Sequence, residues 1–254
     1  MKSHILIPKF LLKKFENEKN FFYCYDVNSG EIKKGHAKSL NTEENYYSED
    51  TEKFLSNCIE NPMSTIIKAF EKAENKKICL PNNYDSIVIN YARALICRGQ
   101  RIKRSVAKNS ISYQFLDEQS KNNYNVNAGL YHAEKEGLFD GYSIELLLNR
   151  SDIPLVLPLC GIYECHTKYT TFLVIPVTPI YAFILIPGKS EHFKEAFSPS
   201  VHCSEVESDF VMLLNEIAFY TEIDTNKMFV VSNCQKELIR LLEKYQTKKG
   251  DESA

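Results

Sequence analysis

The sequence contains no tryptophan, only nine glycines and almost no net charge. Its 31 basic and 33 acidic residues give a formal charge of -2, which excludes a whole-molecule field that would attract nucleic acid or an anionic membrane. Binding of a polyanion therefore needs a local basic patch. Internal repeats, low-complexity tracts and long flexible linkers are also missing, so nothing divides the chain into independent domains.

A long uninterrupted apolar run is missing as well. The longest extends from Phe172 to Pro187, and Pro176 and Pro179 break it before a single helix could span a bilayer. Near the N-terminus, Pro8 and the lysines after it interrupt the apolar run well short of a signal peptide. We therefore expect no membrane partner and a cytoplasmic location.

The common catalytic signatures are absent too. The chain has no Gly-x-Ser-x-Gly elbow, no phosphate-binding glycine loop, no dinucleotide fingerprint and no His-Glu-x-x-His pair. The usual sequence signs of hydrolases, kinases and dehydrogenases are thereby missing. Any active site must be sought in less specific groupings of residues.

Eight scattered cysteines, most with apolar neighbours, predict reduced and mainly buried thiols. A zinc site is the alternative for one group of donors, namely Cys160, Cys165, His166, His202 and Cys203. A second paired-cysteine knuckle is missing, so buried thiols are the simpler interpretation.

The periodicity predicts an α+β fold: a single domain over residues 1–247 with a frayed tail over residues 248–254. In the first half, Pro8 precedes a short helix over residues 9–15, and Gly30 lies in the turn of a β-hairpin formed by residues 21–25 and 31–36. A helical middle follows, with expected helices over residues 54–70, 84–108 and 113–138. We expect Pro62 to kink or divide the first of them.

The second half changes to runs of branched and aromatic residues, which predict a mostly antiparallel sheet. Its expected strands cover residues 144–148, 154–159, 170–174 and 180–186. Two C-terminal helices with a strand between them complete the fold: residues 208–221, 228–231, and a last helix that Ser232 caps and that ends near Tyr245.

The first candidate for chemistry is an acid/base or metal site made by His4, Glu44, Glu52 and Glu60. Imidazole and carboxylate groups move protons and bind divalent cations. Glu52 and Glu60 are eight residues apart, about two helical turns, and so can share a helix face. Alternatively, Glu52 is a helix-start charge favoured by the helix dipole, and His4 is a hydrogen-bonded anchor.

The second candidate is a basic helix face whose members are three or four residues apart: Arg98, Arg101, Arg104 and Lys108. Guanidinium groups bind phosphates well, and Tyr113 and Tyr124 would add stacking surfaces for single-stranded nucleic acid or a nucleotide. A solvated face, or pairing with the acidic segment 43–52, is the alternative. Asn215 lies within an apolar helical pattern, which predicts that it hydrogen-bonds buried backbone.

Short motifs also occur in a particular order. The chain starts with His4-Ile-Leu-Ile-Pro8-Lys-Phe-Leu-Leu12, followed by Tyr25-Asp26 before Gly30, an acidic and aromatic segment from Glu44 to Tyr47, then Glu60, Arg98, Asn215 and Val231-Ser232. This order resembles the uncharacterised bacterial family known as domain of unknown function 4238. The resemblance implies a shared fold and a bacterial origin, and it brings no activity with it. The family's Ser-Asp-Asn-Pro turn lacks its Asp here, in the stretch from Leu157 to Gly161.

Two hypotheses for function follow. In the first, the chain is a nucleic-acid or phosphoester-directed hydrolase, a nuclease-like effector, with a divalent cation as a candidate cofactor. Its catalytic residues are His4, Glu44 and Glu60, and Arg98 and Arg101 hold the phosphate of the nucleic acid or phosphorylated ligand. In the alternative, it is a noncatalytic interaction or regulatory module that meets a protein partner through an exposed patch. The first hypothesis predicts that the named side chains converge.

Overall fold

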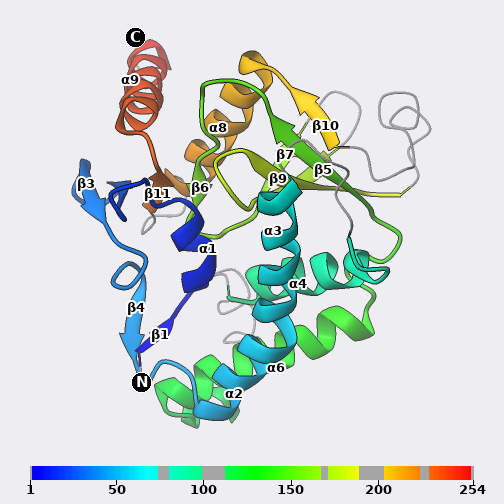
Figure 1. Cartoon of the computed structure of the whole chain (residues 1–254). Coiled ribbons are helices and arrows are strands. Elements are labelled where there is room, and N and C mark those ends of the chain that lie inside the picture. The colour runs from blue at the N-terminus through cyan, green and yellow to red at the C-terminus, as the bar shows by residue number, and fades with distance from the viewer. Residues whose placement is uncertain are drawn as a thin grey trace. The chain divides into compact units, whose positions relative to one another are not determined.

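The computed structural model describes residues 2–73, 80–98, 112–166, 171–188, 203–223 and 229–252, which form two compact units (Figure 1). Residues 1–10 and 41–140 form the first unit, and residues 11–40 and 141–254 form the second. Helix α1, Lys9–Lys14, carries the chain between them. The expected α+β fold is confirmed, with its hairpin, helical middle and mostly antiparallel sheets. A single domain over residues 1–247 stays a prediction.

The first unit consists mainly of helices. Its elements are strands β1 (Lys2–His4) and β4 (Thr42–Glu44), helices α2 (Glu49–Phe54) and α3 (Asn61–Ala73) with a π-helical turn between them (Leu55–Glu60), helix α4 (Tyr84–Arg98), a 3₁₀ turn (Ser112–Phe115) and helix α6 (Glu118–Lys135). Strands β1 and β4 pair in antiparallel fashion, with His4 opposite Thr42 and Lys2 opposite Glu44. Apolar side chains of α3, α4 and α6 form the buried interior, for example Ile66, Val88 and Val126.

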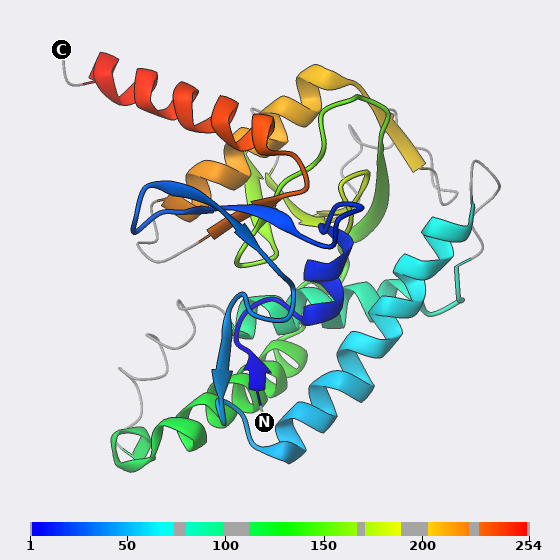
Figure 2. The same cartoon turned by 60° about the vertical axis from the view of Figure 1, so that its left-hand side comes forward.

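The π-helical turn divides one continuous rod of helix, visible in Figure 2, into α2 and α3. Pro62 is the second residue of α3, two positions after the end of this turn. In a regular α-helix the proline ring would meet the carbonyl group of Cys58. Here the N–H of Asn61 instead donates to the carbonyl of Ser56, five residues back, which widens the helix just before the ring. The prediction that Pro62 divides this stretch is confirmed.

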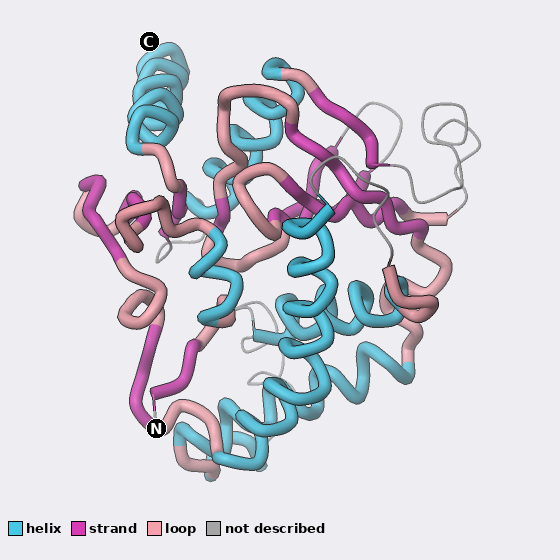
Figure 3. Tube along the Cα trace, in the orientation of Figure 1, coloured by secondary structure: helices cyan, strands magenta, loops and turns pink. Residues whose placement is uncertain are grey.

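The second unit contains two sheets and two long helices. Its elements are strands β2 (Phe22–Asp26), β3 (Glu31–Gly35), β5 (Ser143–Asn149), β6 (Leu157–Pro158), β7 (Tyr163–His166), β8 (Thr171–Pro176), β9 (Tyr181–Ile186), β10 (Cys203–Val206) and β11 (Phe229–Ser232), and helices α8 (Ser208–Ile223) and α9 (Gln235–Glu252). One sheet has the order β10-β5-β9-β8-β7 and the other has the order β3-β2-β11-β6. The strands are drawn as arrows in Figure 1 and in magenta in Figure 3.

The predicted hairpin is present, and Gly30 has a φ of 69°, which favours glycine over other residues. Its strand β2 also pairs with β11, so the N-terminal hairpin is completed by a C-terminal strand. The core of this unit draws on both sheets and both helices. Tyr25 of β2 stacks on Phe219 of α8 with ring centroids 5.2 Å apart, and Leu238 of α9 is fully buried in the same cluster.

Several boundaries differ from expectation. Strands β1, β4, β7 and β10 are short, and β10 pairs in parallel with β5, so neither turn residues nor alternation indicated them in the sequence. Helix α9 extends to Glu252 instead of ending near Tyr245, so the predicted frayed tail begins as helix. Residues 99–111, which carry most of the expected basic helix face, lie outside the described residues. No helix in the described ranges is long and apolar enough to cross a membrane.

Alkylation of the cysteines tests which of their thiols are buried. Burial raises the pKa of the Cys24 thiol to about 12 and that of Cys165 to about 11, whereas Cys58 is exposed. At pH 8 we expect iodoacetamide to alkylate Cys58 at least ~10-fold faster than the other two, because the thiolate is the reactive form. Peptide mapping by mass spectrometry measures this. Equal rates in the folded protein would contradict it, and urea-unfolded protein is the control.

Candidate functional site

A buried ion pair lies at the centre of the first unit. The Nη2 atom of Arg98, the last residue of α4, lies 2.5 Å from Oε1 of Glu60, the last residue of the π-helical turn. The side chain of Arg98 is 2% exposed and that of Glu60 is 23% exposed, so the pair reaches solvent through the carboxylate. Single π-helical turns within α-helices occur often at functional sites. Two residues that the sequence separates by 38 positions are thereby brought together.

The guanidinium of Arg98 is only partly satisfied. Within the described residues, its Nε and Nη1 atoms are buried and have no hydrogen-bond partner. Arg93, on the same helix, is the informative comparison because it is also buried. Its Nε donates to the carbonyl of Leu138, its Nη1 to Asn90 and its Nη2 to Asp140, at 2.8, 3.2 and 2.8 Å. Arg93 thus has the full set of partners expected of a structural arginine, and Arg98 does not.

Two buried tyrosines, Tyr47 and Tyr91, are affected by the charges of the ion pair. Burial raises the pKa of Tyr47 to about 12, with the charge of Arg98 acting in the opposite direction and the carboxylates of Glu52 and Glu60 adding to the increase. Burial also raises the pKa of Tyr91, whose hydroxyl has no hydrogen-bond partner in the described part of the chain. Both hydroxyl groups therefore stay protonated near neutral pH. The Tyr47 hydroxyl donates to the carbonyl of Ile5 at 3.3 Å, whereas the Tyr91 hydroxyl stays available as a donor.

The charge of Arg98 persists despite its burial. Desolvation acts to lower its pKa, but the charge of Glu60 and the hydrogen bond to it, with the neighbouring Tyr47, outweigh that effect and raise the pKa overall. The arginine is accordingly a fixed positive charge in an apolar setting. Such a charge attracts anionic groups more strongly than a solvated one does.

The π-helical turn also aligns the two carboxylates. Residues eight apart in a regular α-helix are offset by roughly 80° around the axis, because each residue turns about 100°. One extra residue in a π-helical turn reduces the offset to about that of seven residues, roughly 20°. Glu52 and Glu60 therefore lie on one face, and Tyr47 is close enough to feel both charges. The Oε1 atom of Glu52 is buried and has no hydrogen-bond partner within the described ranges.

Side-chain amides of α6 hold the segment that carries Tyr47 and starts α2. Gln119 donates to the carbonyl groups of Asn45 and Tyr47, and Asn123 accepts from the N–H of Ser48 at 2.9 Å. Ser48 in turn caps α2 by accepting from the N–H of Thr51. Hydrogen bonds from α6 side chains to the backbone of this segment therefore fix the position of Tyr47 near the ion pair.

The predicted site residues do not all fall in this cluster. Glu60 and Arg98 meet, whereas Glu44 is exposed on β4 opposite Lys2. His4 lies on β1, and its side chain is outside the described part of the structure, as is the whole of Arg101. Sequence reasoning missed Tyr91 and passed over Tyr47, because both follow ordinary core patterns. At Arg98 the structure has a buried ion pair with Glu60, and neither the solvated face nor the pairing with segment 43–52 that was the alternative for the basic helix.

The donors of the candidate zinc site that the structure describes do not come together as metal ligands. Strand β7 buries Cys165 and exposes His166, so alternation places the two side chains on opposite faces of the strand. The Sγ atom of Cys160 lies 2.8 Å from the carbonyl oxygen of Ile162. No group of three or more His, Cys, Asp or Glu residues suited to a metal ion occurs among the described residues, which do not include His202.

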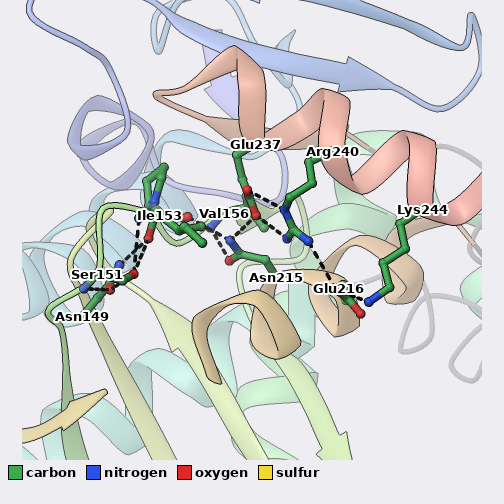
Figure 4. A network of polar contacts seen from close by, with 10 residues as sticks. Asn149, Ser151, Ile153, Val156, Asn215, Glu216, Glu237, Arg240 and Lys244 are labelled. Carbon is green, nitrogen blue, oxygen red and sulfur yellow. Dashed lines mark hydrogen bonds and ion pairs between the residues drawn. The ribbon is translucent and has the colours of Figure 1, made fainter. Parts of the chain in front are cut away.

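A separate polar network in the second unit is fully paired (Figure 4). Asn215 of α8 accepts from the N–H of Val156 and donates to the carbonyl of Pro154 and to Glu237 of α9. The prediction that Asn215 hydrogen-bonds buried backbone is confirmed. Arg240 binds Glu237 through both Nε and Nη2, at 2.9 and 2.8 Å. This network joins α8, α9 and the loop before β6, and we assign it to stability.

Fold and site together define an α+β protein with a buried, incompletely paired charge cluster in its helical unit. The model of the family described as Protein of unknown function (DUF4238) matches residues 4–139. The match covers more than half of the 254 residues, so the chain belongs to this family. It includes Glu60 and Arg98 but ends before Asn215, whose place in the family pattern stays a prediction. Comparisons with curated proteins and with solved structures found no match.

Proposed function

We propose that the chain is a phosphoester-directed hydrolase whose site is the cluster around Glu60 and Arg98. The observation that supports it is the partly unpaired guanidinium of Arg98, which keeps two buried nitrogen donors for a ligand. Paired N–H donors of arginine match the oxygen atoms of a phosphate. The matched family region contains both residues, and its description names no activity.

The proposed reaction needs a general base and a group that binds the phosphoryl oxygens. The ion pair uses Oε1 of Glu60, and we assign Oε2 as the atom that takes a proton from the attacking water. The water oxygen forms a bond to phosphorus while the bond from phosphorus to the leaving oxygen breaks with its electron pair. That oxygen then takes a proton from solvent. Arg98 stabilises the negative charge on the phosphoryl oxygens. The catalytic roles of His4 and Glu44 and the phosphate-binding role of Arg101 stay predictions.

The test is turnover by the full chain, with magnesium or manganese present, of p-nitrophenyl phosphate, bis(p-nitrophenyl) phosphate and single-stranded DNA. For Glu60→Gln we expect kcat to fall by roughly 100-fold or more, because a general base typically contributes this much. Glu49→Gln on the neighbouring α2 is the matched control, since Glu49 is exposed and, among the described residues, forms an ion pair only with Lys53. Its kcat should match that of the unchanged protein.

Two outcomes would contradict the proposal. The first is the absence of turnover on all three substrates, and the second is an unchanged kcat in folded Glu60→Gln. Folding of each variant is checked by circular dichroism, and Arg98→Lys provides a second variant that keeps the charge but loses the planar fork. We expect Arg98→Lys to raise KM at least ~10-fold.

Exposed aromatic side chains favour a second function, a noncatalytic interaction module. Phe115 is 85% exposed, and Tyr124 and Tyr131 lie seven residues apart on α6 and so on one side of the helix. Exposed aromatic residues gathered in this way are typical of surfaces that a protein partner covers. This module is the function we would favour if none of the three substrates is hydrolysed.

A further inference from the structure

Several side chains of the first unit have buried polar atoms without a hydrogen-bond partner in the described residues, and Arg98, Tyr91 and Glu52 are among them. Within the described ranges, hydrogen-bond partners are missing for Nε and Nη1 of Arg98, the hydroxyl of Tyr91 and Oε1 of Glu52. An unsatisfied buried polar atom is costly, and native proteins keep few of them. Arg98 contacts Glu60, and Tyr91 lies seven residues before Arg98 and so on the same side of α4. Glu52 lies on the same helix face as Glu60, and the charges of both carboxylates act on Tyr47. They comprise hydrogen-bond donors and one carboxylate oxygen.

The charges of the cluster restrict its ligand. Two carboxylates, Glu52 and Glu60, and one guanidinium, Arg98, leave a surplus of one negative charge. A bare phosphate would add further negative charge beside the carboxylates, and a bare cation would leave the donors of Arg98 and Tyr91 unused. A divalent cation and a phosphate bound together satisfy both sets of atoms. Mg²⁺ is commonly held in this manner, by one or two carboxylates, waters and the oxygens of a substrate phosphate.

We propose that this cluster binds a phosphate monoester together with a divalent cation, an inference that rests on the proposed hydrolase function because it names the ligand of the same site. Arg98 and Tyr91 donate to the phosphate oxygens. Glu52 holds the cation together with waters and phosphate oxygens, and Tyr91 and Glu52 are new members of the site. The donors are buried and the outlet to solvent lies at Glu60, so a terminal phosphate fits better than one inside a polymer.

The experiment is a four-way thermal unfolding series on the full chain: no addition, MgCl₂ alone, inorganic phosphate alone, and both. We expect either one alone to change Tm little, and both together to raise it by roughly 5 °C or more. Isothermal titration of phosphate in the presence and absence of Mg²⁺ gives the dissociation constants. If Mg²⁺ and phosphate share a site, each must raise the binding affinity of the other by the same factor.

Two variants identify the atoms. Without ligand, Tyr91→Phe should have an equal or higher Tm, because it removes an unpaired buried hydroxyl, yet it should bind phosphate with Mg²⁺ roughly 10-fold more weakly. Glu52→Gln should lose most of the joint increase in Tm. Glu49→Gln is the control, since Glu49 is exposed on α2 and its variant should behave like the unchanged protein.

The outcomes separate this inference from the proposed function. A joint increase in Tm that Tyr91→Phe and Glu52→Gln abolish, without turnover, supports the ligand and contradicts the hydrolase. Turnover without a joint increase in Tm overturns the ligand assignment and leaves the hydrolase standing. A joint increase that both variants retain also overturns it, because the ions then bind elsewhere.

Discussion

Replacing Glu60 with glutamine is expected to lower the free energy of unfolding by about 3 kcal/mol, because removing one member of a buried ion pair leaves the other charge uncompensated. The side chain of Arg98 is 2% exposed, and Glu60 is the carboxylate paired with it. Urea unfolding followed by circular dichroism measures the change. Glu49→Gln, on the exposed side of α2, should differ from the unchanged protein by less than about 0.5 kcal/mol.

The same ion pair allows stability and binding to be separated. In the double variant Glu60→Leu with Arg98→Met both charges are removed together, and we expect most of the lost stability to return, because apolar replacements of a buried ion pair are often neutral or stabilising. The double variant should nevertheless bind no phosphate. A Glu60→Gln protein as stable as the parent would show that the pair is solvated, which the burial of Arg98 argues against.

Replacing Asn215 with alanine is expected to cost about 3 kcal/mol or more in the free energy of unfolding, since several buried groups lose their partner at once. The N–H of Val156, the carbonyl of Pro154 and the carboxylate of Glu237 each contact this one amide, as Figure 4 shows. Asn215 is 1% exposed and Glu237 is 5% exposed, so water cannot readily substitute. Urea unfolding is again the measurement.

A matched comparison within α9 tests whether this network stabilises the fold. Glu237→Gln should be destabilising because it removes the charge that faces Arg240, whereas Glu243→Gln, the same change at an exposed position of the same helix, should be close to neutral. The effects of Asn215→Ala and Glu237→Gln should not add, because the two residues share a hydrogen bond. Fully additive losses would mean that the two side chains act independently.

Local patterns predicted much of the fold. The turn at Gly30, the division at Pro62 and the helix after Ser208 follow from the backbone requirements of single residues or from the helical period, and the structure has all three. The pairing of β8 with β9 through the proline-containing turn was also predictable. In each case the deciding interactions lie within a few residues of one another.

Features that depend on distant partners were not predictable in this way. The pairing of β1 with β4 spans about forty residues and involves three residues on each side, too few for a period to be recognised. Glu60 and Arg98 were each singled out, but their ion pair depends on how the π-helical turn meets the end of α4. Tyr91 follows the apolar period of a core helix, so its unpaired hydroxyl appears only in three dimensions.

The pairing of β2 with β11 delays completion of this sheet while the chain is synthesised at the ribosome. Asp26 pairs with Phe229, so about 200 residues separate the two strands. At roughly 5 to 20 residues per second, the hairpin emerges from the exit tunnel some 10 to 40 s before its C-terminal partner. One edge of β2 stays open to aggregation or chaperone capture throughout that interval. The first unit, whose segments all precede residue 141, is translated completely while the second still waits for its closing strand.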